Sequence, residues 1–104
     1  MGKEGEVGKI TTIKDGRKVV TTAGTRVALV SSSTPAKYVI LQAETDNAGV
    51  IAWGGVTVVA TVLTRQGQAL LAGDSSPWIP IDDLLDIYLD STVSGDGVTY
   101  IYLT

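Results

Sequence analysis

Hydrophobic and polar residues alternate along most of this chain in short segments, and residues typical of turns end each segment. The alternation is clearest in residues 37–44, where both sides of an extended segment would be largely apolar. We therefore expect a central strand there, covered on both faces. Because turn residues recur about every 8–12 positions, the pattern predicts an all-β fold. It would be a single small β-sandwich or jelly roll of about 8–10 short, mostly antiparallel strands.

Individual strands and turns can be assigned from the same pattern. Three hairpins are expected, joining residues 7–13 to 18–22 through Asp15-Gly16, 37–44 to 50–53 through 46–49, and 84–90 to 98–103 through 91–97. Further strands are expected over residues 26–31, 56–63, 68–71 and 78–81, the last at a sheet edge because it contains Pro80. The alternative for the segment that begins at Leu84 is a helical turn capped by Asp82-Asp83.

Length and charge favour one domain preceded by a basic arm. The chain has 104 residues and a net charge of −3. Residues 1–26 carry six basic and three acidic side chains, or +3, whereas residues 27–104 carry two basic and eight acidic ones, or −6. We expect residues 1–18 to form a flexible arm and residues 19–104 the β-sandwich. Such an arm would suit an acidic surface, and the alternative is a solvated segment without a partner.

The composition argues against catalysis. The chain has no His and no Cys, which removes the commonest general base, the commonest metal ligand and the strongest nucleophile. No phosphate-binding glycine loop is present, so we expect no enzyme and no cofactor. Nucleic acid is not an expected partner because the body is acidic. No apolar run could cross a membrane, and residues 1–6 lack the core of a secretory signal, so we expect synthesis and retention in the cytoplasm unless lysis releases the chain.

Acidic residues near position 86 are the only candidates for a metal site. Calcium prefers oxygen ligands, and four carboxylates lie within nine positions: Asp82, Asp83, Asp86 and Asp90. Their spacing does not match a preformed calcium loop. We therefore interpret them as a solvated acidic rim and predict no metal, with Asp82, Asp86 and Asp90 as the candidates. Asp74 and Asp96 are interpreted as turn formers.

Aromatic and basic side chains are the candidates for binding. Trp53 and Trp78 fall near sheet margins, where each would serve as a sugar-stacking platform, an interface anchor or a plug at one end of the core. Tyr100 and Tyr102 share one face of the last strand, which we expect at a subunit interface. The predicted interface with a partner or a second subunit consists of Lys9, Lys14, Arg17, Lys18, Trp53, Trp78, Tyr100 and Tyr102.

Several turn motifs occur in an order that resembles small bacteriophage head-decoration proteins, also called capsid cement proteins. The motifs are Gln42-Ala43 at a strand end, Asn47-Ala48-Gly49, Ala72-Gly73-Asp74 and the closing Gly95-Asp96-Gly97. The resemblance covers roughly residues 19–104. It implies a β-sandwich, with a homotrimer favoured, that binds the major capsid protein at capsomer junctions on the virion surface. Under this resemblance the predicted interface residues would contact the capsid or a neighbouring subunit, and the hypothesis is that residues 1–22 latch onto one of these two. It transfers no catalytic residues. The alternatives are a carbohydrate-binding or receptor-binding β module, or a tail or fibre subunit.

Overall fold

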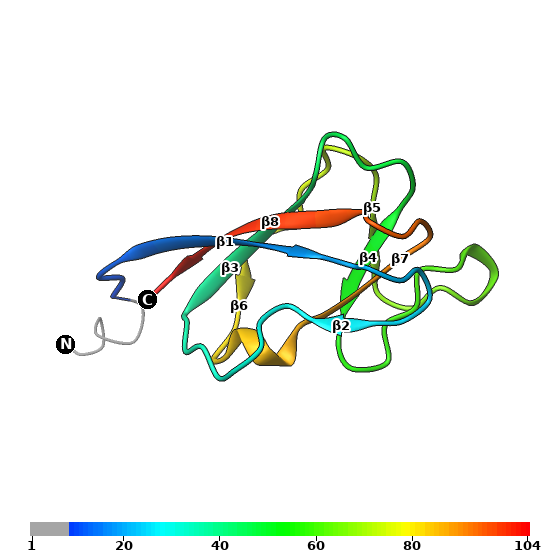
Figure 1. Ribbon diagram of the computed structural model, residues 1–104. Helices are drawn as coiled ribbons and strands as arrows, with labels where there is room; N and C mark the ends of the chain where they lie inside the picture. Colours follow the sequence, from blue (N-terminus) through cyan, green and yellow to red (C-terminus); the bar gives the residue numbers. More distant parts are fainter. Residues whose placement is uncertain (1–8) are drawn as a thin grey trace.

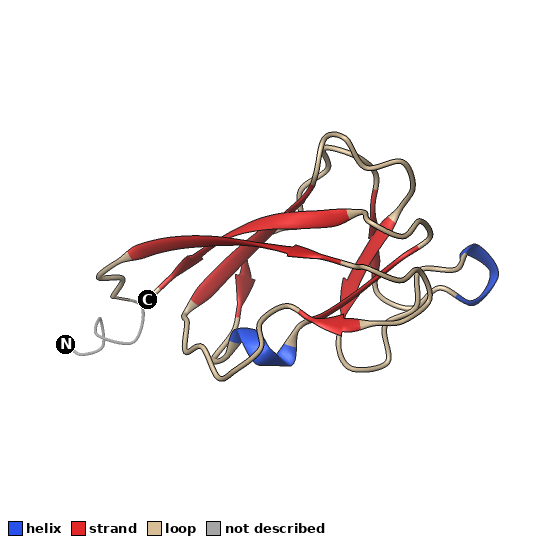
Figure 2. Cartoon of the chain, viewed as in Figure 1, coloured by secondary structure: helices blue, strands red, loops and turns tan. Residues whose placement is uncertain are grey.

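The computed structural model describes residues 9–104, which form an all-β domain of two packed four-stranded sheets (Figures 1 and 2). The eight strands are β1 (Ile13–Val19), β2 (Val27–Ala28), β3 (Tyr38–Ala43), β4 (Ile51–Gly54), β5 (Gln68–Leu70), β6 (Ile79–Pro80), β7 (Tyr88–Ser91) and β8 (Gly97–Leu103). Two short 3₁₀ turns are η2 (Val62–Thr64) and η3 (Leu84–Asp86). Among the described residues no helix is long and apolar enough to cross a membrane.

The strand order is that of a jelly roll. The first sheet has the order β1-β8-β3-β6 and the second the order β2-β7-β4-β5. Every pair of hydrogen-bonded strands is antiparallel. Only β4 and β5 are neighbours in both the sequence and a sheet, because every other connection passes from one sheet to the other. The predicted fold class is therefore confirmed, in its jelly-roll form.

All three predicted hairpins are wrong. Asp15-Gly16 is not a turn but the middle of β1, where Asp15 lies opposite Ile101 and Gly16 opposite Tyr100. The segments on either side of residues 46–49 become β3 and β4, and those on either side of residues 91–97 become β7 and β8; both pairs lie in different sheets. In the second and third cases the turn residues correctly mark where the chain reverses. They do not reveal that the reversal leads to the opposite sheet.

Other predicted elements differ in detail. The strand expected over residues 56–63 is wrong, since these residues form a loop that continues into η2. The strand over 68–71 is confirmed as β5, and Pro80 lies in the short edge strand β6 as predicted. The helical turn after Asp83 is present as η3, with the Asp83 carboxylate accepting a hydrogen bond from Leu85 N–H.

The expected N-terminal arm overlaps the first sheet. Residues 1–8 of that arm lie outside the described residues. Residues 13–18 belong to β1, which pairs with β8 along its whole length, and Val20 is fully buried in the core. The sheet therefore begins at Ile13 and not after residue 18.

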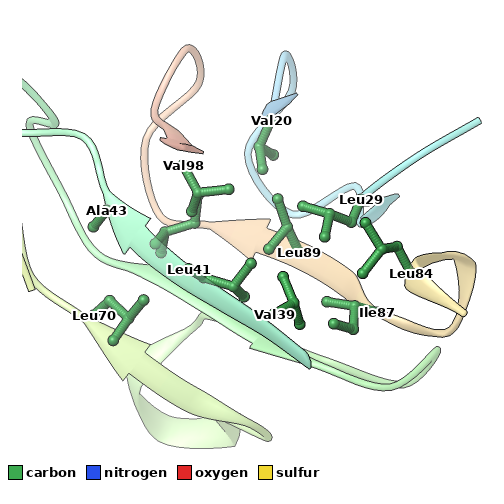
Figure 3. Close-up of a cluster of buried hydrophobic side chains, with 11 residues drawn as sticks. Val20, Leu29, Val39, Leu41, Ala43, Leu70, Leu84, Ile87, Leu89 and Val98 are labelled. Carbon is green, nitrogen blue, oxygen red and sulfur yellow. The ribbon is translucent and has the colours of Figure 1, made fainter. Parts of the chain in front are cut away.

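The core lies between the two sheets, as Figure 3 shows. Val39, Leu41 and Ala43 project inward from β3 as the alternation predicts, and Leu89 of β7 meets them from the second sheet. The other face of β3 is only half covered and ends in the exposed Gln42, so the expectation of a strand covered on both faces is wrong. Fourteen hydrophobic residues of the described range 9–104 are buried, and packing of this kind is the main stabilising contribution in a domain without disulfides.

Two loops at one end of the sandwich bind each other through the motifs noted in the sequence. The Asn47 side chain donates to Gly97 C=O and accepts from Gly97 N–H, both at 2.9 Å. The Asp96 carboxylate accepts from Ala48 N–H at 3.0 Å and from Gly49 N–H at 2.8 Å. These hydrogen bonds fasten the β3–β4 connection to the β7–β8 connection, so the motif residues have a structural role.

Candidate interaction surfaces

The outer face of the first sheet carries an uncovered apolar surface. Directly opposed residues of neighbouring strands point to the same side of a sheet. The β1-β8-β3 register therefore places five apolar side chains on the face turned away from the core: Ile13, Tyr38, Ile40, Ile101 and Leu103. Ile13 is 74% exposed and Ile101 43% exposed. We call these five residues the outer sheet face.

The middle of this face is hollowed. The hollow lies along β1, β8 and β3, with Ile40 and Ile101 among its lining residues. Asp15, Gln42, Ser75 and Thr99 supply polar groups to the lining. The site can receive an apolar side chain and offers hydrogen-bonding groups around it.

A charged rim adjoins the hollow. Arg17 and Glu44 form a hydrogen-bonded salt bridge. The hydrogen bond to Glu44, and after it the negative charge of Glu44, raise the pKa of the Arg17 guanidinium. Asp46 is exposed beside this pair, and Gln42 and Thr99 line both the hollow and the charged rim. Together with Asp15, the rim therefore carries three acidic side chains, and Arg17 balances the charge of one of them, Glu44.

The basic residues predicted at the interface do not form one patch. The register puts Arg17 on the outer side of β1, whereas Lys14 and Lys18 share the opposite side with Tyr102 and Val98. Lys9 is exposed and precedes the strand. The basic character of the N-terminal segment is therefore divided between the two faces of β1.

Tyr100 and Tyr102 point toward the core side of β8 and pack against its margin, with ring centroids 6.0 Å apart. Burial, and then the charge of Tyr102, raise the pKa of Tyr100. A methyl group added at Gly16 would lie 2.4 Å from the Tyr100 ring, so Gly16 leaves space for this ring. Within this structure, both tyrosines act in packing between the sheets. The prediction that they lie at a subunit interface stays a prediction.

The two tryptophans have different surroundings. Trp53 packs against the core and its indole N–H donates to the Gln68 side chain at 2.7 Å. This geometry matches the alternative in which Trp53 closes one end of the core. Trp78 is 48% exposed and lies between Pro77 and β6. Of the two, Trp78 is the one that offers an aromatic surface to a partner.

The candidate metal ligands are separated. Asp90 is 2% exposed, and its carboxylate accepts from Gly24 N–H at 3.0 Å and Ala60 N–H at 2.8 Å. Asp83 accepts hydrogen bonds from Ser33, Leu85 and Thr34, which lower its pKa in that order of importance. Asp82 and Asp86 are exposed near η3. Within residues 9–104, no group of three potential ligands is close enough to hold a metal ion.

A second apolar feature is the β4–β5 loop, residues 55–67, which includes the segment 56–63 where a strand was expected. Its tip exposes Val62 by 70% and Leu63 by 94%. Figure 1 shows this loop projecting from the end of the molecule remote from the C-terminus. The flanking glycines, Gly54-Gly55 and Gly67, were the available signal for a loop, since they bracket a Val- and Thr-rich segment at both ends.

Comparison with family models, curated proteins and solved structures finds no match to this chain.

Proposed function

We propose that this chain is a structural assembly protein that decorates and stabilises a bacteriophage capsid by binding the outer shell at capsomer junctions. The observation that carries the proposal is the outer sheet face. Its end nearest the C-terminus presents Ile13, Leu103 and Tyr38 in one cross-strand row. Large apolar side chains on a strand surface favour association, because the free energy falls when a partner removes them from water.

Two likenesses support a virion setting. The order of turn motifs resembles that of phage decoration proteins, and the jelly-roll strand order is also common among viral capsid domains. The second likeness concerns architecture alone, because one fold serves many functions. The proposed partner is the major capsid protein. A small domain that bridges neighbouring capsomers adds interface that must be broken before a pressurised shell can rupture.

Cosedimentation with capsids assembled without this chain tests the proposal. We expect the wild-type protein to pellet with such capsids and to raise their rupture temperature, and the Ile13→Asp variant to bind at least ~10-fold more weakly. Leu71→Asp is the matched control, because Leu71 is a 61% exposed aliphatic residue outside the outer sheet face. Urea unfolding would verify that both variants are folded. Equal binding by Ile13→Asp and wild type, or no binding by any of the three proteins, would contradict the proposal.

A second candidate function is carbohydrate binding, which the exposed Trp78 favours. Indole rings in such positions stack on the apolar faces of sugars. In that case Trp78→Ala would abolish binding on a glycan array and leave the unfolding free energy nearly unchanged. Retained capsid binding by the same variant would assign Trp78 no part in decoration.

A further inference from the structure

The molecule carries a projecting apolar tip and an apolar hollow on different surfaces. Leu63 and Val62 form the tip of the β4–β5 loop, and the hollow lies on the outer face of the first sheet, where the neighbouring side chains of Ile40 and Ile101 form part of its lining. A projection on one surface that fits a recess on another allows a head-to-tail contact between identical subunits, which closes into a ring when the rotation permits.

The loop is held firmly enough to act as a projection. Val59 and Gln66 exchange two backbone hydrogen bonds of 3.1 and 3.0 Å at its base. Val58 and Ala60 are buried beneath it, where the Asp90 carboxylate holds Ala60 N–H. An added methyl group at Gly67, which has φ of +103°, would lie 2.5 Å from Trp53 C=O. The base is thus fixed by packing and hydrogen bonds, while the tip is exposed.

The charges of the two surfaces are complementary. Residues 55–64 carry no charged side chain, so insertion of the tip into the hollow buries no ion. Arg26 and Arg65 lie at the base of the loop, with their Nε atoms donating to Val58 C=O and Ala60 C=O at 3.0 Å. The hollow is lined by Asp15 and adjoins the exposed Asp46. Basic groups behind the tip would therefore meet acidic groups around the recess.

We propose that the occupant of the hollow is the β4–β5 loop of a second copy of this chain, with Leu63 packed against Ile40 and Ile101, and that repetition of this contact closes a ring. The inference deepens the proposed function, on which it rests, by naming the partner of one part of the outer sheet face. The row of Ile13, Tyr38 and Leu103 remains for the capsid.

Disulfide trapping tests this contact directly, because the chain has no cysteine of its own. An equimolar mixture of Leu63→Cys and Ile101→Cys proteins is oxidised gently and resolved by non-reducing electrophoresis. We expect a mixed dimer at a yield at least ~10-fold above that of the control mixture of Leu71→Cys with Ile101→Cys. A yield equal to the control overturns the proposal.

Solution mass provides a second measurement that does not need a covalent bond. Light scattering of the full-length wild type should give a small multiple of the 10.8 kDa chain mass. Leu63→Asp should be a folded monomer, as should Val62→Asp if the first variant fails to fold, and Leu71→Asp should keep the wild-type mass. A monomeric wild type, or an oligomeric Leu63→Asp protein, overturns the contact. Light scattering uses the protein without capsids and therefore tests only the contact between subunits. If the wild type were monomeric but still bound capsids, this contact would be wrong and the proposed function would stand.

Discussion

Asp90 shows how one buried carboxylate connects parts of the chain that lie far apart in sequence. It is almost fully buried on β7, and its two oxygen atoms accept from the backbone of Gly24 and of Ala60. Both donors belong to loops, so no strand partner satisfies those N–H groups. The carboxylate therefore has a structural role in fixing the β4–β5 loop.

We expect Asp90→Ala to lower the free energy of unfolding by about 2–4 kcal/mol, because two backbone N–H groups would lose their acceptor in a buried setting. Asp90→Asn should cost less, since its carbonyl oxygen can still accept one hydrogen bond. Urea denaturation measures both. Asp46→Ala is the control, because Asp46 is exposed, and it should change stability by no more than about 0.5 kcal/mol. A loss below about 1 kcal/mol for Asp90→Ala would contradict this role.

At the scale of the element, Gly16 and Tyr100 explain why a glycine stands in the middle of β1. Gly16 has no left-handed backbone conformation that would require glycine. Instead, the ring of Tyr100, the residue opposite it on β8, occupies the space where a side chain at position 16 would lie. The glycine is thus needed for cross-strand packing and not for a turn.

A double-mutant cycle can test this explanation. Gly16→Ala should destabilise the wild type by about 1–3 kcal/mol, because the ring must move out of its preferred position. In a Tyr100→Ala background the same change should be neutral or stabilising by up to about 1 kcal/mol, since alanine suits a strand better than glycine. Urea denaturation of the four proteins gives the coupling energy. Equal effects in both backgrounds would show that Tyr100 is not the reason for the glycine.

The same pair of residues shows what sequence reasoning could and could not predict. Alternation correctly identified β3 and its inward residues, because burial on one side of a strand follows a period of two. Asp15-Gly16 resembled a turn because the identity of a glycine does not tell whether it supplies backbone freedom or space. The opposing tyrosine lies 84 residues further along the chain, so no local pattern reveals it.

The sequence pattern did not predict the outer sheet face, for a related reason. Ile13, Ile40 and Ile101 come from three distant segments, and only the register of β1, β8 and β3 places them on one face. Sequence reasoning favoured basic and aromatic residues, which are frequent at interfaces. It could not tell that the tyrosines turn toward the core and that the basic side chains divide between two faces.

At the scale of the whole molecule, the jelly-roll order makes the first strand essential to the sheet. β8 is paired on one side by β1 and on the other by β3, so removal of β1 would leave β8 as an open edge. It would also uncover Tyr100 and expose the backbone groups of a seven-residue ladder. Sheet edges of that kind promote aggregation.

Two truncated proteins distinguish a dispensable N-terminal segment from an essential strand. A chain that begins at Lys9 keeps β1 complete and should unfold within about 1 kcal/mol of the full-length protein. A chain that begins at Lys18 loses most of β1, and its free energy of unfolding should fall by several kcal/mol. For a whole domain this free energy is typically about 5–15 kcal/mol. Urea denaturation and light scattering would show the loss and any aggregation. If the Lys18 chain were as stable as the full-length protein, β1 would contribute nothing to the stability of the sheet. That result would contradict an essential β1 and would support an independent arm that includes residues 13–18.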